Sequence, residues 1–171
     1  MAVLIRPAQI NEAGPIATLH AEIWRETYQG LAPAAALKKL DAAHRLATWQ
    51  KYLTTPAPCQ RVLVAVRDAQ IVGFIGFGPP THPAFGAYGE IKHLYVDPKC
   101  KRQWVGQRLL QAAFRQMAKD GFETAALAVV RDNRPARAFY TKMQGVEVGH
   151  FIDAGPIWKS DNSIIAWDIE A

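Results

Sequence analysis

A basic loop that leads into an apolar helix is the segment whose residue types point most clearly to chemistry. Residues 101–110 read KRQWVGQRLL, in which Lys101, Arg102 and Arg108 surround a Trp-Val-Gly sequence. The first turn of a helix offers backbone N–H groups without partners in the helix and the positive end of the helix dipole, so an anion binds there favourably. The segment therefore predicts a phosphate-binding loop.

Trp104 is the residue that departs from such a loop. A loop that wraps closely around a phosphate usually has glycine, because glycine has no side chain and adopts positive φ at no steric cost. Tryptophan keeps its backbone N–H but has neither property. We expect the substitution to be tolerated. The alternative is that the site needs close approach on that side, in which case Trp104 weakens binding. A plainer interpretation is that Trp104 packs on the surface against Pro98 or a symmetry partner and that Lys101 and Arg102 form a solvated basic turn.

A second chemically suggestive segment, NRPARAFYTKMQG, follows at residues 133–145. Asn133 stands where a helix begins, and Tyr140 follows two turns later. Phe139 and Tyr140 are expected to point from this helix toward the element beside it. A helix-face aromatic that packs in the core is the plainer interpretation of Tyr140.

The elements that must position these segments alternate between helical and extended patterns. A strand is predicted over 3–6, a helix from Asn11 to Tyr28, a short helix that begins at Pro33, and a helix capped by Asp41. Two β runs cover 61–78 and are joined by a tight turn at 68–70. Further strands are predicted at 90–96, 124–130, 146–152 and 162–169, and helices at 106–117 and 134–143. This order predicts one mixed α/β domain over residues 1–171 with no interdomain linker.

Composition and charge limit the classes of protein that fit. The 171 residues are 50% hydrophobic and 20% charged, with 20 Lys and Arg against 15 Asp and Glu, a net charge of +5. A mild basic excess suits an anionic ligand, whereas nucleic-acid binding is not indicated because no long Lys/Arg run is present. Cys59 and Cys100 lack metal-ligand spacing, so no metal is expected. Without a signal-like N-terminus or a long apolar run, a cytoplasmic protein without membrane contact is predicted.

Together these segments resemble the GNAT-type N-acetyltransferases. That family has a strand, then Q/R-x-x-G-x-G/A and a helix, and later N-x-x-A-x-x-x-Y followed by a glycine. The matching positions here are Lys101, Trp104 and Gly106, followed by Asn133, Ala136, Tyr140 and Gly145. The IRPA, WRETYQGLAP, VGFIGFG and IIAWDI segments extend the resemblance over the whole chain.

The resemblance implies a mostly antiparallel, twisted central sheet of an α/β (mixed α+β) fold, splayed between its fourth and fifth strands and flanked by helices. It implies acetyl-CoA as cosubstrate, with pantetheine lying along the fourth strand as an added strand. A backbone N–H near Val96 would polarise the thioester carbonyl. The cofactor-binding residues implied are Leu94, Tyr95, Val96, Lys101, Arg102, Gln103, Trp104, Val105, Gly106, Gln107, Arg108, Asn133, Ala136 and Tyr140.

The resemblance also implies catalytic roles. Tyr140 would protonate the departing thiolate, because a phenol has a pKa near that of a thiol. Glu90 lies six positions before Val96, where the histone-acetylating branch of the family has its catalytic glutamate, and is the candidate general base. Strict alternation along the strand predicts that Glu90, Lys92, Leu94 and Val96 share one face and that Ile91, His93 and Tyr95 share the other. His93 is the alternative base, and a reaction with no single base is a third interpretation.

The acceptor is expected to be the primary amine of a small molecule of polyamine, aminoglycoside or amino-acid type, bound by Trp24, Tyr28 and Glu90. Further residues that suit a cationic amine are Glu22, Glu26, Asp153, Asp161 and Trp158. The plainer interpretation places Ile23, Trp24 and Tyr28 in the core. Competing functions are a CoA-binding protein without catalysis and an acetyltransferase of protein N-termini or lysines. A homodimer with Trp104 or Trp158 in its interface is a further hypothesis.

Overall fold

A seven-stranded mixed sheet in the order β1-β2-β3-β4-β5-β7-β6 organises the computed structural model, which describes residues 2–169. All neighbouring strands are antiparallel except β4 and β5, which are parallel. This arrangement confirms the predicted mixed α/β sheet. The strands are β1 (Leu4–Pro7), β2 (Arg61–Arg67), β3 (Gln70–Gly78), β4 (Gly89–Val96), β5 (Thr124–Val130), β6 (Val146–Ile152) and β7 (Asp161–Asp168).

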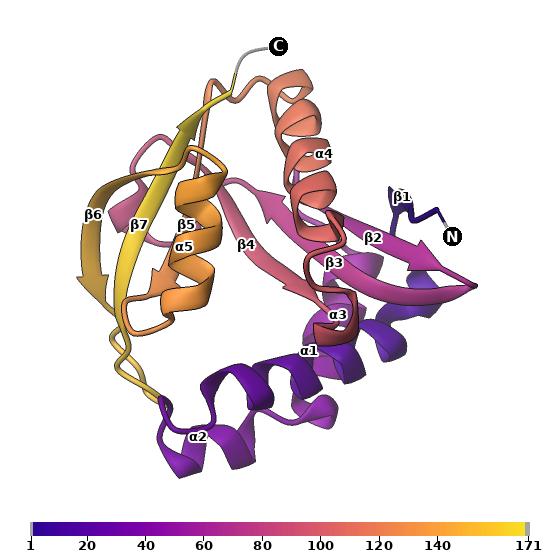
Figure 1. Cartoon of the computed structure of the whole chain (residues 1–171), viewed down its shortest axis with the longest axis horizontal. Coiled ribbons are helices and arrows are strands. Elements are labelled where there is room, and N and C mark those ends of the chain that lie inside the picture. Colours follow the sequence, from indigo (N-terminus) through magenta and orange to yellow (C-terminus); the bar gives the residue numbers. More distant parts are fainter. Residues whose placement is uncertain (1, 170–171) are drawn as a thin grey trace.

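Helices cover both faces of the sheet (Figure 1). They are α1 (Ala13–Tyr28), α2 (Ala34–Lys39), α3 (Ala42–Thr54), α4 (Val105–Lys119) and α5 (Arg134–Lys142), with 3-10 turns at Ile10–Glu12, Pro83–Phe85 and Pro98–Cys100. One core cluster joins α4 and α5 to the sheet, and Leu109 and Met117 are completely buried in it. The cluster on the opposite face joins α1 and α3 to the sheet around Trp49 and Phe74. Full burial of one such side chain contributes roughly 1.5–3 kcal/mol.

Local capping chemistry fixes several helix starts. Asp41 accepts a hydrogen bond from the His44 backbone N–H at 2.8 Å, and so confirms the predicted cap of α3. The prediction for Asn11 was wrong, because a 3-10 turn precedes α1 and contains Asn11. The carboxylate of Glu12 holds that turn by accepting from Gln9 N–H at 2.7 Å and from Arg6 at 2.6 Å. Pro33 is the N-cap of α2 rather than its first helical residue.

The β2–β3 hairpin turns over two residues. Asp68 and Ala69 both have positive φ, 51° and 62°, the combination that matches the right-handed twist of a hairpin. Gln70 already belongs to β3, so the tight turn is confirmed and is one residue shorter than predicted.

A β-bulge in β4 changes which residues share a face. Gly76 of β3 pairs with His93, but its neighbour Phe77 pairs with Ile91, so Lys92 is an extra residue in β4. Ile91 consequently packs with Leu94 and Val96 in the cluster under α4. Glu90, which pairs with Gly78, lies on the side of the sheet that His93 occupies. The predicted alternation was therefore wrong before Lys92, because a bulge shifts the strand by one residue.

Candidate functional site

β4 and β5 separate soon after they pair. Their ladder contains only Gly89 with Ala125 and Glu90 with Ala126. Beyond these pairs the two strands diverge toward α1 and α2 (Figure 1). The space between them is a cavity of about 810 Å³, lined by residues 91–96 of β4, 127–129 of β5, and parts of α1, α4 and α5. The predicted splay between the fourth and fifth strands is confirmed.

One end of the cavity is the N-terminus of α4. The first hydrogen bond within this helix runs from Arg108 N–H to Trp104 O, and no side chain caps the helix. The N–H groups of Val105, Gly106 and Gln107 therefore have no partner within the helix and face the end of the cavity that Lys101 and Arg102 also line. This end is suited to an anion.

Trp104 occupies the N-cap of α4 in the left-handed conformation, with φ 64° and ψ 5°. Its side chain is 65% exposed. The Lys142 Nζ atom lies 5.8 Å from the centroid of the indole, within the range of a cation–π interaction. The backbone at this position thus keeps the conformation that favours glycine, while the indole extends outward beside Lys142.

Gly106 serves packing as well as the loop. A β-carbon at Gly106 would lie 3.3 Å from the Phe139 Cζ atom and 3.7 Å from Val96 Cγ2. The missing side chain lets the first turn of α4 approach both α5 and the end of β4. Gly106 therefore brings the three elements that form this end of the cavity together.

Three phenols gather deeper in the cavity, from three different elements: Tyr28 of α1, Tyr95 of β4 and Tyr140 of α5. Burial raises the pKa of Tyr140 well above its ordinary value, and Tyr28 raises it further. Burial likewise raises the pKa of Tyr95, with a further contribution from Tyr28. All three phenols therefore carry their protons at neutral pH and are hydrogen-bond donors.

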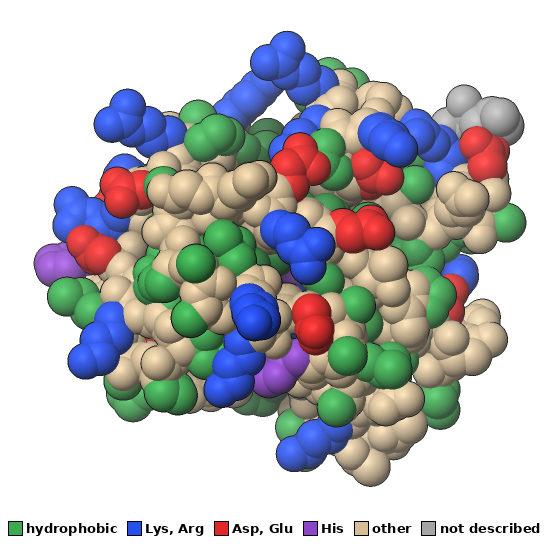
Figure 2. Space-filling model, turned by 90° about the horizontal axis from the view of Figure 1, so that it is seen from below, with side chains coloured by type: hydrophobic (Ala, Val, Ile, Leu, Met, Phe, Trp, Pro, Cys, Tyr) green, Lys and Arg blue, Asp and Glu red, His purple; other side chains and the backbone are tan. Residues whose placement is uncertain are grey.

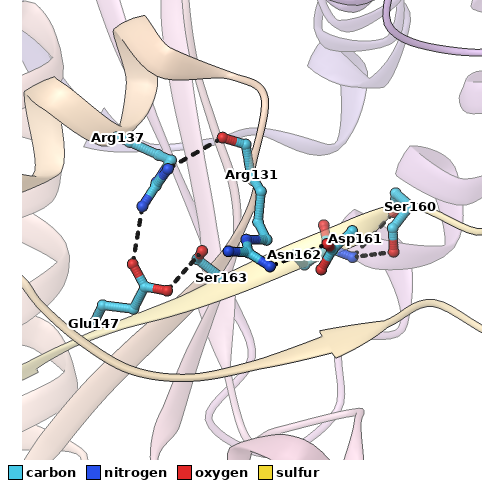
Figure 3. A network of polar contacts seen from close by, with 7 residues as sticks. All are labelled: Arg131, Arg137, Glu147, Ser160, Asp161, Asn162 and Ser163. Carbon is cyan, nitrogen blue, oxygen red and sulfur yellow. Dashed lines mark hydrogen bonds and ion pairs between the residues drawn. The ribbon is translucent and has the colours of Figure 1, made fainter.

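A polar network holds α5 against the two last strands (Figure 3). Arg137 of α5 donates to Glu147 of β6 at 3.0 Å and to the Arg131 carbonyl at 3.3 Å. Glu147 accepts from the buried Ser163 hydroxyl of β7 at 3.0 Å. At the start of α5, Asn133 accepts from Ala136 N–H at 3.3 Å, which confirms it as the helix cap. These contacts fix the helix that carries Tyr140.

Glu90 and His93 occupy different surroundings. Glu90 is only 9% exposed, does not line the cavity, and accepts from the Thr81 N–H and hydroxyl at 2.7 and 2.8 Å. His93 lines the cavity. Burial, together with the positive charges of Arg45 and Lys92, lowers the pKa of His93 to about 3. His93 is therefore neutral at physiological pH but a weak base.

Most of the predicted cofactor residues meet at the cavity. Tyr28 of the predicted acceptor residues also lines it, whereas Gln103, Arg108, Trp24 and Glu90 do not. Gln103 instead accepts from Arg67 at 2.6 Å. The predicted residues on the lining are Leu94, Tyr95, Val96, Lys101, Arg102, Trp104, Val105, Gly106, Gln107, Asn133, Ala136 and Tyr140.

Sequence reasoning missed several lining residues, among them Lys92, Phe139 as a packing partner of Gly106, and Lys142. The α5 residues had a visible signal, since positions 135, 139 and 142 recur at helical spacing with 136, 140 and 143. Lys92 had one as well, because the predicted alternation already placed it on the face of Leu94 and Val96.

The acidic residues expected to bind a cationic amine lie elsewhere. Within residues 2–169, no Asp or Glu lines the cavity. Asp161 pairs with Arg131 at 3.3 Å, and Asp153 accepts from Gly155 N–H at 3.1 Å. Glu22 and Glu26 are exposed on α1. Trp158 packs against Trp24 and Tyr28, and its place in a homodimer stays a prediction.

The surface seen in Figure 2 mixes basic and acidic side chains without one large patch of either sign on that face. In the described part of the chain, no helix has the length and apolarity needed to cross a membrane.

Comparisons with known proteins agree with this geometry. The model of the acetyltransferase (GNAT) family matches residues 17–146. The uncharacterized N-acetyltransferase YuaI of Bacillus subtilis is 27% identical over 139 residues, which are 81% of this chain and 77% of that protein.

Solved structures with the same fold include the PaiA N-acetyltransferase of Thermoplasma acidophilum in complex with coenzyme A. Its TM-score is 0.73 at 22% identity, over 98% of this chain and 99% of that one. YncA of Salmonella typhimurium, a putative acetyltransferase with its cofactor acetyl-CoA, has a TM-score of 0.72 at 16% identity. The match covers 100% of this chain and 96% of that one. Since the family model covers most of the chain and the splayed sheet underlies its cavity, this protein belongs to the GNAT family of acetyltransferases.

Proposed function

We propose that the chain is an acetyl-CoA-dependent N-acetyltransferase that transfers the acetyl group to a primary amine by direct attack. The observation that carries the proposal is the cavity in the β4–β5 splay, which has an anion-binding helix N-terminus at one end and buried phenols within it. The same fold holds coenzyme A in PaiA and acetyl-CoA in YncA.

The residues present fit coenzyme A. The N–H groups at the start of α4, with Lys101, Arg102 and Lys142, supply donors and positive charge for its phosphates. The edge of β4 that turns away from β3 offers backbone groups at residues 94–96 to the amides of pantetheine. Bound acetyl-CoA supplies an activated acyl group, and the protein supplies position and proton transfer.

Tyr140 is the proposed general acid for the leaving thiolate. It lines the cavity, and its raised pKa keeps the proton on the phenol until a base is formed beside it. A free thiol has a pKa near 8.5, below that of the buried phenol, so the proton transfer is uphill and requires the thiolate to be in direct contact with the Tyr140 hydroxyl.

Glu90 is the proposed general base. Its carboxylate is held by Thr81 and lies on the same side of the sheet as His93. Because Glu90 does not itself line the cavity, the proton of the amine would pass to it through an ordered water. His93 touches the cavity directly, but its low pKa makes it the weaker candidate.

A CoA-binding protein without catalysis is the second candidate, and the bulky, exposed Trp104 at the loop is the observation that favours it. Calorimetry with acetyl-CoA, on the wild type and on Trp104→Gly, tests binding. CoA release over a panel of amines then tests turnover. Micromolar binding with release supports the acetyltransferase, binding without release on any amine supports the second candidate, and binding only by the Gly variant shows that Trp104 blocks the site.

A further inference from the structure

Four basic side chains line the cavity, and one of them lies away from the end that suits the phosphates of CoA. The charged residues on the lining are Lys92, Lys101, Arg102 and Lys142, and all four are basic. Lys101, Arg102 and Lys142 belong to the end formed by the start of α4. Lys92 does not, because it lies four residues before Val96, about 13 Å along the strand at 3.3 Å per residue.

Lys92 is the extra residue of the β4 bulge. As the unpaired extra residue of β4, Lys92 has no cross-strand partner in β3. Its half-buried side chain lines the cavity on the β4 side, close to His93. Among residues 2–169, no carboxylate lies within ion-pair distance of it. Glu90 acts on Lys92 by its charge but makes no ion pair with it, and its carboxylate accepts instead from Thr81.

A second cation without an ion pair among the described residues lies behind the lining of the cavity. Arg45 of α3 is only 9% exposed, and its Nη2 atom is buried with no hydrogen-bond partner. Its Nη1 lies 2.8 Å from His20 Nε2, its Nε donates to the Leu40 carbonyl at 3.3 Å, and its guanidinium lies 5.3 Å from the Trp24 ring centroid. Within the described residues, it has no ion pair with a carboxylate.

His20 links Arg45 to the cavity. The His20 ring lies 5.2 Å from the His93 ring and 4.5 Å from the Tyr95 ring, centroid to centroid, and both of those residues line the cavity. The guanidinium is thus one side-chain layer from the cavity, in surroundings of low polarity where its charge is screened little. A buried cation without a counter-ion is costly to the free protein.

We propose that the acceptor amine carries an acidic group, a carboxylate in the first place, which Lys92 binds and which the charge of Arg45 attracts. This inference rests on the proposed acetyltransferase function and narrows it to amino-acid-like acceptors. Polyamines and aminoglycosides are disfavoured, since a polycation would meet Lys92 and no acid on the lining, with the charge of Arg45 one side-chain layer behind it. A carboxylate would instead form an ion pair with Lys92, which has none in the described residues, and would be attracted by the nearby charge of Arg45.

Matched pairs of amines test the proposal. Each pair consists of an amino acid and the amine that lacks its carboxylate, such as L-lysine and cadaverine, or L-phenylalanine and phenethylamine. CoA release gives kcat/KM for both members. Calorimetry on CoA-saturated protein gives their affinities even if no acetyl group is transferred. A charge-assisted contact to the carboxylate predicts a preference of about 10- to 100-fold for the amino acid in at least one pair.

Variants of Lys92 test whether its positive charge binds the carboxylate of the acceptor. Lys92→Met is expected to reduce the preference to within about threefold by removing the charge, whereas Lys92→Arg keeps it. Lys119→Met, on the exposed end of α4 away from the cavity, is the matched control and retains the full preference. Arg45→Met is expected to weaken the preference in the same direction. Its melting temperature is measured alongside, because this residue is buried.

The outcomes distinguish failure of the acidic-acceptor proposal from failure of the proposed acetyltransferase function. Turnover of cadaverine or a polyamine at least as good as that of the amino acids overturns the acidic-acceptor proposal and leaves the acetyltransferase intact. Equal affinity within every pair, or no binding of any amino acid, also overturns it. Carboxylate-dependent binding without CoA release supports the acceptor site and contradicts the transfer reaction.

Discussion

The backbone at Trp104 predicts an unusual order of stability among substitutions. With φ 64°, the residue has the left-handed conformation, which costs a non-glycine residue about 1–2 kcal/mol. Trp104→Gly removes that cost but adds about 0.5–1 kcal/mol of backbone entropy lost on folding. It also removes the Lys142 cation–π contact, worth about 0.5–1 kcal/mol at an exposed site. The Gly variant is therefore expected to have nearly the stability of the wild type.

Trp104→Ala keeps the conformational cost and loses the Lys142 contact, so it gains nothing in return. We expect it to be about 0.5–1 kcal/mol less stable than Trp104→Gly, from the difference between the strain relieved and the entropy lost. In a domain of this size 1 kcal/mol shifts Tm by roughly 2–4 °C, so the Ala variant should melt about 2 °C lower. Urea unfolding and thermal scans of both variants measure the difference.

Arg115 supplies a control position at which the glycine variant should be less stable than the alanine variant. It is exposed on α4, a helix that extends from Val105 to Lys119, so glycine there costs about 1 kcal/mol relative to alanine. Arg115→Gly should be less stable than Arg115→Ala, while the order is reversed at residue 104. If Trp104→Ala equals or exceeds Trp104→Gly in stability, the left-handed backbone is not what limits this position, and the reasoning is refuted.

Further expectations concern catalysis and pH. Tyr140→Phe should lower kcat at least about tenfold, in line with loss of a general acid, while acetyl-CoA affinity by calorimetry stays nearly constant; an unchanged kcat removes Tyr140 from the mechanism. Glu90→Gln should lower kcat about 100-fold, whereas a larger effect of His93→Gln would reassign the base. Burial lowers the pKa of His20. Burial and nearby cations lower the pKa of His93 to about 3. The unfolded chain then binds more protons below pH ~6.5, so stability should fall as the pH drops toward 3, by about 1.4 kcal/mol per unit for each histidine. Urea unfolding at pH 7 and pH 5 measures the loss, and His93→Phe should reduce it; an equal loss in that variant would show that His93 does not contribute.

Local patterns in the sequence were enough to predict much of the fold. Asp41 and Asn133 act on backbone N–H groups three residues away, so their capping roles can be predicted from the chain alone. The apolar period of α4 and the uninterrupted apolar run of β5 likewise reflect which faces are buried. The anion-binding end of the cavity was predictable for the same reason, because it is one continuous loop and helix start.

Features that depend on pairing between distant segments were decided by the tertiary structure. The bulge at Lys92 exists only because β4 pairs with β3 one residue out of step, and it turns Glu90 to the side of His93 and Ile91 to the side of Leu94. The uncompensated charge of Arg45 is likewise invisible in the sequence, since it requires α3 to pack against α1 and bury the guanidinium beside His20. The sequence by itself thus determined the elements and the helix start at one end of the cavity, whereas non-local packing determined the charged surroundings for which we propose acceptor selection.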